Sequence, residues 1–107
     1  VQVNLFNETQ KNGCSIEELP LLLHTLQTLE HLNCRGLMTI LPQGLSEAEQ
    51  LNSYQHLFQL MHQYNQEFGI QMDTLSMGMS EDYPQAILAG SNIIRLGQAI
   101  FGPRSYA

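Results

Sequence analysis

Two short stretches near the C-terminus carry residue types that could hold an anionic ligand. In the first, LSMGMS, Ser76 is followed by Gly78 and then by Ser80, where a helix could begin. A glycine lets backbone approach a ligand, and the free N–H groups at a helix start bind anions. The pattern predicts an anion site that uses the hydroxyl of Ser76. A serine that only caps a turn explains Ser76 equally well.

The second stretch, RLGQA, could complete such a site. Gly97 precedes Gln98 and Ala99, whose free N–H groups would point at an anion if a helix begins there. Arg95 lies two residues before Gly97 and therefore on the same face of a strand. A guanidinium in an apolar strand needs partners, and no acidic residue lies at a matching strand position. We therefore expect Arg95 to face a ligand, with a purely structural role as the alternative.

The charge of the chain argues against a nucleic-acid partner. Ten acidic residues outnumber four basic ones, and the formal net charge is −6. The basic residues are scattered at Lys11, Arg35, Arg95 and Arg104. Proteins that bind phosphodiester backbones cluster their lysines and arginines. We therefore expect no nucleic-acid binding.

Membrane, disulfide and metal-binding functions are also disfavoured. The longest apolar run, Leu19 to Leu23, is interrupted by Pro20 and is far shorter than the roughly 20 residues of a membrane helix. Cys14 and Cys34 form no CxxC pair, which indicates reduced thiols in a cytoplasmic protein. The histidines lack ligand spacing such as HxxxH, so we expect no metal site.

Four short β-like runs alternate with helical patterns along the chain. Strands are expected over 1–6, 34–40, 70–77 and 92–97. The first two helices are expected from Ser15 to near Leu32 and from Ser46 to Gly69, each with a glutamate three residues after its serine, as in a capping box. Pro20 predicts either an irregular first turn in the first of them or a start nearer Leu19. Shorter helices are expected from Ser80 to Gly90 and over Gln98–Phe101.

This alternation predicts one α/β domain over residues 1–107, with four parallel strands alternating with helices. Four such strands form either a small open sheet or half of a (β/α)8 TIM-type barrel. Because the chain starts inside a strand, the half barrel is the better interpretation. In both folds ligands bind at the carboxyl ends of the strands.

Several stretches of the sequence resemble one known family. LSMGMS and the pattern R-x-G-x-x-IFG are similar to the C-terminal signature of the pyridoxal phosphate homeostasis proteins. VNLFNETQKNG and CRGLM resemble upstream motifs of the same family, so the resemblance covers nearly the whole chain. It implies a barrel similar to the N-terminal domain of alanine racemase, of which this chain would be the C-terminal half.

The resemblance also implies a cofactor and residue roles. Pyridoxal 5′-phosphate (PLP) would be bound through its phosphate by the Ser76 hydroxyl and by the backbone N–H groups of Gly97 and Gln98. Arg95 would face the pyridine nitrogen and disfavour its protonation, which weakens the cofactor as an electron sink. The implied function is non-catalytic PLP binding in vitamin B6 homeostasis. The alternatives are a racemase-like PLP enzyme fragment and a fragment that binds no ligand.

Two departures from the family follow from the sequence. Its Schiff-base lysine lies on the first barrel strand, in the N-terminal half that this chain lacks, and Lys11 matches a loop lysine instead. Gly90-Ser91-Asn92 stands where Gly-Ser-Thr is usual. A half barrel would also expose two strand edges, so we expect self-association or pairing with an N-terminal half.

Overall fold

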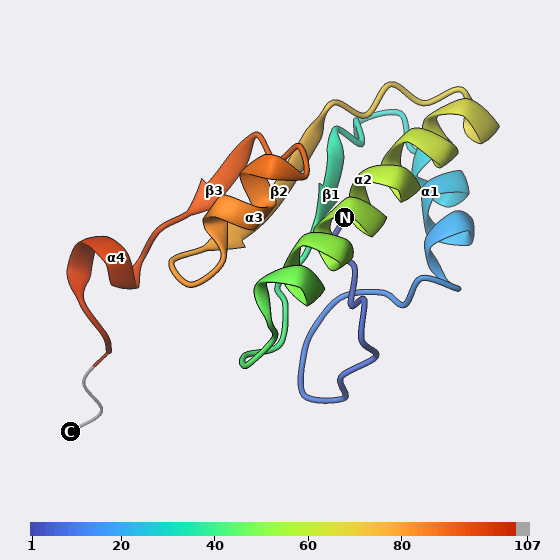
Figure 1. The fold of residues 1–107 in the computed structure, drawn as a ribbon. Helices are drawn as coiled ribbons and strands as arrows, with labels where there is room; N and C mark the ends of the chain where they lie inside the picture. The colour runs from blue at the N-terminus through green and yellow to red at the C-terminus, as the bar shows by residue number, and fades with distance from the viewer. Residues whose placement is uncertain (105–107) are drawn as a thin grey trace.

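The computed structural model describes residues 1–104. The expected domain therefore extends beyond it by three residues, 105–107. In chain order the elements are α1 (Leu19–Gln27), β1 (Gly36–Met38), α2 (Glu47–Phe68), β2 (Thr74–Met79), α3 (Tyr83–Leu88), β3 (Ile93–Arg95) and α4 (Gln98–Phe101), as Figure 1 shows. Among the described residues, no helix is both long enough and apolar enough to cross a membrane.

The strands form a parallel sheet in the order β1-β2-β3, as expected for an α/β chain with helical crossovers. The expected first strand is the exception, because residues 1–6 contribute only isolated bridges. The Val3 N–H donates to the Met38 carbonyl and the Met38 N–H to the Val1 carbonyl, each at 2.8 Å. After these contacts, the Asn4 side chain bonds to both backbone groups of Glu8 and turns the chain into a loop. Asn4 therefore ends the segment by capping this loop.

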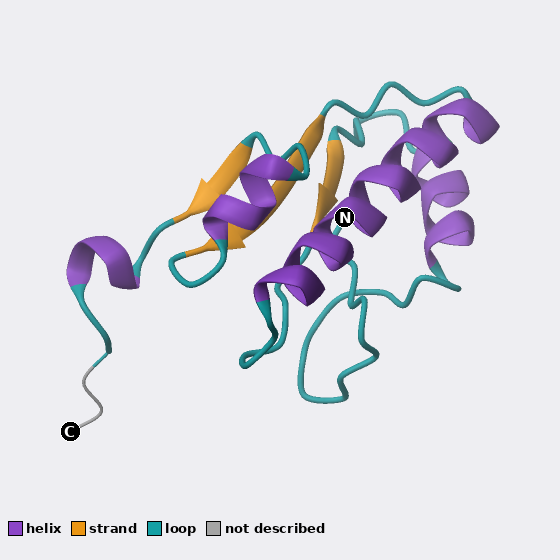
Figure 2. Cartoon of the chain, viewed as in Figure 1, coloured by secondary structure: helices purple, strands orange, loops and turns teal. Residues whose placement is uncertain are grey.

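Helices cover one face of the sheet. Figure 2 shows α2 and α3 on the same side, and the side chains of Leu37, Leu75 and Met77 are buried in the core. Because side chains alternate along a strand, the intervening residues lie on the other face. There Met38 and Ser76 are only partly buried. The second face of the sheet is therefore less covered than the first.

The long helix α2 follows from its terminal signals. The hydroxyl of Ser46 accepts the Glu49 N–H at 3.2 Å, and the Glu49 carboxylate accepts the Ser46 N–H at 3.2 Å. This reciprocal pair satisfies two donors that the helix itself leaves free. Gly69 ends the helix with φ 65°, a left-handed conformation that glycine adopts at low cost. Both predicted ends of α2 are confirmed.

The helix α1 is shorter than expected. Ser15 and Glu18 make the expected reciprocal hydrogen bonds, but they close a turn before the helix, which begins at Leu19 with Pro20 as its second residue. At the other end, the Thr28 hydroxyl donates to the carbonyl of Thr25 at 2.7 Å. Beyond this point the leucines are exposed, so no buried surface stabilises further turns.

Side chains reinforce the pairing of β2 with β3. The Asn92 amide accepts the Leu75 N–H at 2.8 Å and donates to the Asp73 carbonyl at 2.7 Å. The Ser91 hydroxyl donates to the Met77 carbonyl at 2.6 Å. Asn92, which departs from the threonine usual in the resembled family, is thus an integral part of the sheet edge.

Candidate functional site

A cavity of about 680 Å³ lies at the carboxyl ends of the three strands. Its walls are residues 40–43 after β1, the end of β2 and the loop after it (79–82), residues 97–98 after β3, Gln50 of α2, Lys11 and residues 101–104. Ligands of parallel α/β folds bind at this end of the sheet. The cavity is therefore the candidate functional site.

Polar groups from two of these loops meet in the cavity. The Ser80 hydroxyl, from the loop after β2, accepts the Ala99 N–H of α4 at 2.9 Å. Gly97 and Gln98 line the same cavity, and within residues 1–104 their backbone N–H groups have no hydrogen-bond partner. A Cβ placed on Gly97 would meet no atom within 4 Å. The site thus combines two free N–H groups, one hydroxyl and open space beside a glycine.

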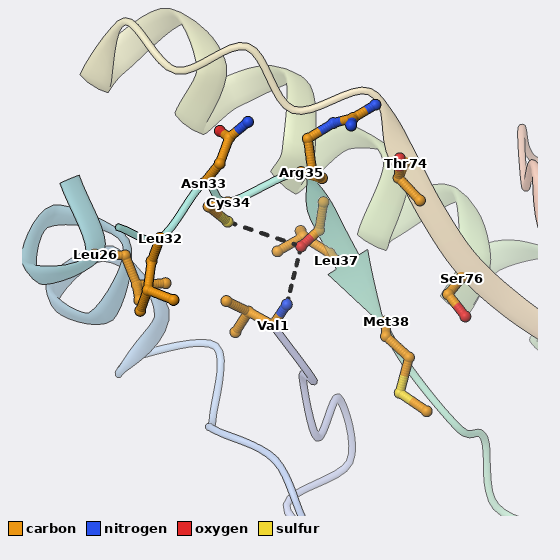
Figure 3. A pocket seen from close by; sticks show the side chains of 11 residues that line it. Val1, Leu26, Leu32, Asn33, Cys34, Arg35, Leu37, Met38, Thr74 and Ser76 are labelled. Carbon is orange, nitrogen blue, oxygen red and sulfur yellow. Dashed lines mark hydrogen bonds between the residues drawn. The ribbon is translucent and has the colours of Figure 1, made fainter. Parts of the chain in front are cut away.

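Ser76 lies elsewhere. It is in the middle of β2, where it pairs with Met38, and it lines a second cavity of about 360 Å³ near the amino ends of the strands. Figure 3 shows it there with Thr74 and Met38. The structure therefore does not bring Ser76 together with Gly97 and Gln98.

The serine that the structure brings to Gly97 is Ser80, which sequence reasoning had placed only at a helix start. Strand β2 runs to Met79, two residues beyond its expected end. The first hydroxyl after the strand is consequently Ser80. The extension coincides with Gly78, whose φ of 110° accompanies an irregular register between β2 and β3. A glycine two residues before Ser80 is the only sequence signal of this irregularity.

Arg95 has partners within the sheet. Its Nη2 atom donates to the Thr39 carbonyl at 2.9 Å and approaches the Ser76 carbonyl at 3.4 Å. The guanidinium therefore bridges from β3 across β2 to the end of β1. Its Nε atom is buried and has no hydrogen-bond partner among residues 1–104. Arg95 thus has a structural role, and its expected contact with a ligand stays a prediction.

Lys11 also lies at the cavity, but its amine is engaged. It donates to the Leu41 carbonyl at 3.0 Å and forms an ion pair with Glu8 at 3.6 Å. These contacts hold the loop after β1 against the N-terminal loop. Glu8 and Lys11 are therefore a loop ion pair.

Behind the cavity, Tyr54 of α2 faces Asp82, and both are buried. Burial raises the pKa of the Tyr54 phenol, and its hydrogen bond to the Asp82 carboxylate raises that pKa further. The carboxylate of Asp82 also accepts the Met79 N–H at 2.8 Å. Sequence reasoning missed this pair, since 27 positions separate its members and no local spacing connects them.

The raised pKa of Tyr54 predicts a loss of stability in alkali. Above its ordinary pKa of about 10, Tyr54 ionises in the unfolded chain while the folded chain keeps it protonated. The free energy of unfolding should therefore fall as pH rises, by up to about 1.4 kcal/mol per pH unit from this group. Urea unfolding of wild type and Tyr54→Phe near pH 10 and above measures it. The variant should lose stability less steeply, and parallel pH profiles would contradict the assignment.

Comparison with known proteins supports the resemblance found in the sequence. The family model described as "Alanine racemase, N-terminal domain" matches residues 1–105. A pyridoxal phosphate homeostasis protein of Synechocystis is 44% identical over 104 residues, which are 97% of this chain and 48% of that protein. The corresponding protein of Haemophilus influenzae is 42% identical over 108 residues, covering 100% of this chain and 46% of the relative.

Solved structures agree with this assignment. The structure of PipY of Synechococcus elongatus with PLP bound superposes with a TM-score of 0.88 at 33% identity, covering 95% of this chain and 47% of PipY. The chain spans about half the length of the curated relatives it matches. The family match extends over nearly the whole sequence, and the fold agrees with it. The chain therefore belongs to the family of the alanine racemase N-terminal domain, in which the relatives named above are pyridoxal phosphate homeostasis proteins.

Proposed function

We propose that the chain contributes the phosphate subsite of a non-catalytic PLP-binding protein in vitamin B6 homeostasis. The observation that carries the proposal is the meeting of Ser80, Gly97 and Gln98 at the carboxyl ends of the strands. Free N–H groups and a hydroxyl are the donors that a phosphate dianion requires. The homology to PLP homeostasis proteins and to PipY, whose structure holds PLP, supports the choice of ligand.

The residues present fit a phosphate at this place. The missing side chain of Gly97 leaves space for a phosphate oxygen to approach the backbone N–H groups of Gly97 and Gln98. The hydroxyl donor in this proposal is Ser80, because Ser76 lines the other cavity. Ser80 would then turn its proton toward the ligand while still accepting the Ala99 N–H.

Arg95 is proposed to act on the electronics of the cofactor. Its Nε has no hydrogen-bond partner among residues 1–104, and its N–H could donate to a pyridine nitrogen. A permanently charged guanidinium beside that nitrogen disfavours its protonation, so the ring withdraws electrons less strongly. This suits storage of PLP better than catalysis. Lys11 is the only lysine of the sequence, and its engagement with Leu41 and Glu8 is consistent with a non-catalytic role.

We further propose that the three-stranded sheet is part of half a (β/α)8 barrel. Helices on one face and a second face that is only partly covered are what half of such a barrel would show. The chain also spans about half of its relatives. The N-terminal segment and β3 would be the edges that pair with another half or a second copy. A monomeric mass by light scattering at micromolar concentration would rule out self-association.

Thermal protection by ligand tests the function. PLP at concentrations well above its dissociation constant should raise the unfolding temperature of the chain, because it binds only the folded state. Pyridoxal, which lacks the phosphate, should protect much less. Equal protection by both compounds would contradict the phosphate subsite. No protection by PLP up to millimolar concentration would contradict the proposed function of this chain.

Gly97→Ala should separate binding from stability. The new methyl group would meet no atom of residues 1–104 within 4 Å and the φ of −88° suits alanine, so the unfolding free energy should stay near wild type. PLP affinity should fall about tenfold or more, because the methyl occupies the space proposed for the phosphate.

Gly69→Ala is the matched control, since its methyl also meets no atom but its φ is 65°. It should lose about 1 kcal/mol of stability and keep its PLP affinity. Equilibrium dialysis and urea unfolding measure the two quantities. If Gly97→Ala binds PLP as wild type does, Gly97 is not part of the subsite.

A further inference from the structure

We propose that Tyr54 and Asp82 are positioning residues that fix the turn carrying Ser80 and so place its hydroxyl in the anion subsite. This inference rests on the proposed function for its ligand. Asp82 lines the same cavity, but neither Asp82 nor Tyr54 is one of the proposed donors Ser80, Gly97 and Gln98. The two residues come from α2 and from the start of α3. The element that they hold is the turn from Met79 to Asp82.

Two reciprocal hydrogen bonds close this turn. The Asp82 carboxylate accepts the Met79 N–H at 2.8 Å, and the Asp82 N–H donates to the Met79 carbonyl at 3.1 Å. Asp82 is also the N-cap residue of α3, yet its side chain makes no capping bond to that helix. A carboxylate at an N-cap ordinarily bonds to the first free N–H groups of its helix. Here it is directed to the turn instead.

Tyr54 fixes the carboxylate from behind. Its exposed fraction is 1% and that of Asp82 is 8%, so both polar groups are nearly removed from water. A buried carboxylate is stable only with donors around it, and a buried hydroxyl only with a partner. The phenol of Tyr54 lies beside the Asp82 carboxylate, which raises its pKa, and beside the backbone N–H of Gly78, which lowers it. The rigid helix α2 is thereby connected to both sides of the turn.

The turn affects the site through the position of Ser80. Ser80 lies inside the closed turn, and its hydroxyl accepts the Ala99 N–H at 2.9 Å. Little apolar packing holds α4, in which Ile100 is 67% exposed and Phe101 85% exposed. Figure 1 shows α4 standing away from the other helices. The position of Ser80 relative to Gly97 and Gln98 therefore depends on the shape of this turn.

Tyr54→Phe tests the proposal, because it removes one hydroxyl and keeps the ring in the core. Inorganic phosphate binding, followed by NMR titration of the full chain, should weaken about tenfold, the effect of one well-placed hydrogen bond. Amide hydrogen exchange should become faster at Met79 and Ala99. Tyr64→Phe is the matched control, since it removes the same atom from a buried tyrosine of the same helix. It should leave both readouts at wild-type values.

Two substitutions of Asp82 provide a second, independent test. Asp82→Asn keeps an oxygen that can accept the Met79 N–H, whereas Asp82→Ala does not. Phosphate affinity and slow exchange should survive better in the asparagine variant than in the alanine variant. A merely structural role would instead lower stability in both and leave the phosphate affinity of the folded protein unchanged. If Tyr54→Phe does not fold, the comparison of Asp82→Asn with Asp82→Ala tests the proposal instead.

The outcomes separate the two proposals. If wild type binds phosphate and folded Tyr54→Phe binds it equally well, with unchanged exchange at Ala99, the positioning role is overturned. If wild type binds neither phosphate nor PLP, the proposed function fails. In that case the exchange rates at Met79 and Ala99 still decide whether Tyr54 and Asp82 hold the turn.

Discussion

Gly36→Ala is expected to destabilise the protein more than any other single methyl addition considered. A Cβ at position 36 would overlap the carbonyl oxygen of Thr74 and lie 2.6 Å from its carbonyl carbon. Gly36 and Thr74 are paired across β1 and β2, so the clash involves backbone on both sides. Side-chain rotation cannot relieve it, and the strands would have to separate. We expect a loss of more than about 3 kcal/mol, a large part of the stability of a small domain.

Urea unfolding followed by circular dichroism measures this loss. Gly97→Ala is the control, because it adds the same methyl group where no atom lies within 4 Å. Only Gly36→Ala should show a much lower unfolding midpoint or no native baseline. A Gly36→Ala variant with the wild-type midpoint would mean that β1 and β2 do not approach as closely as described.

Local signals predicted the elements that depend on local contacts. The capping box at Ser46 and the glycine at position 69 gave both ends of α2, because those bonds form within a few residues. The short helix α4 has the predicted bounds, Gln98–Phe101. The parallel order of the strands followed from the length of their helical connections.

Elements that depend on distant contacts were predicted less well. Residues 1–6 have strand-like composition, but Asn4 turns the chain toward Glu8 and leaves only bridges. The end of α1 depended on whether Leu29 and Leu32 are buried in the core. Both are exposed, so the helix ends before them. The close approach at Gly36 could not be read from the sequence, since it requires the position of Thr74 on another strand.

The same limit explains why Ser80, and not Ser76, lies at the cavity. Gly97 and Gln98 were predicted from a pattern that is local, and the structure places them at the cavity. The choice between Ser76 and Ser80 required the end of β2, which the irregular register around Gly78 moves to Met79. Predicting the role of Tyr54 would have required knowing how α2 packs against the loop after β2. Sequence reasoning therefore pointed to Gly97 and Gln98, which line the cavity, but did not predict that Ser80 rather than Ser76 lies beside them.

Arg95→Gln should lower the free energy of unfolding by about 2 kcal/mol, which is typical of a lost hydrogen bond to a charged group. The shorter glutamine cannot span from β3 to the Thr39 carbonyl, which the Arg95 guanidinium reaches at 2.9 Å. That carbonyl belongs to a fully buried residue, so water replaces the lost donor poorly. Urea unfolding at neutral pH measures the loss.

Arg35→Gln is the matched control, because it removes the same group from an exposed pair with Asp73. It should unfold near the wild-type midpoint. The ligand readouts then separate the two roles of Arg95. If Arg95 also faces the pyridine nitrogen, Arg95→Gln should shift the absorption of bound PLP and leave the affinity for inorganic phosphate unchanged, since Ser80, Gly97 and Gln98 are intact. If Arg95→Gln instead weakens the binding of PLP and of inorganic phosphate equally, Arg95 has only a structural role. The hydrogen bonds to the carbonyls of Thr39 and Ser76 would then explain why an arginine lies in this apolar strand.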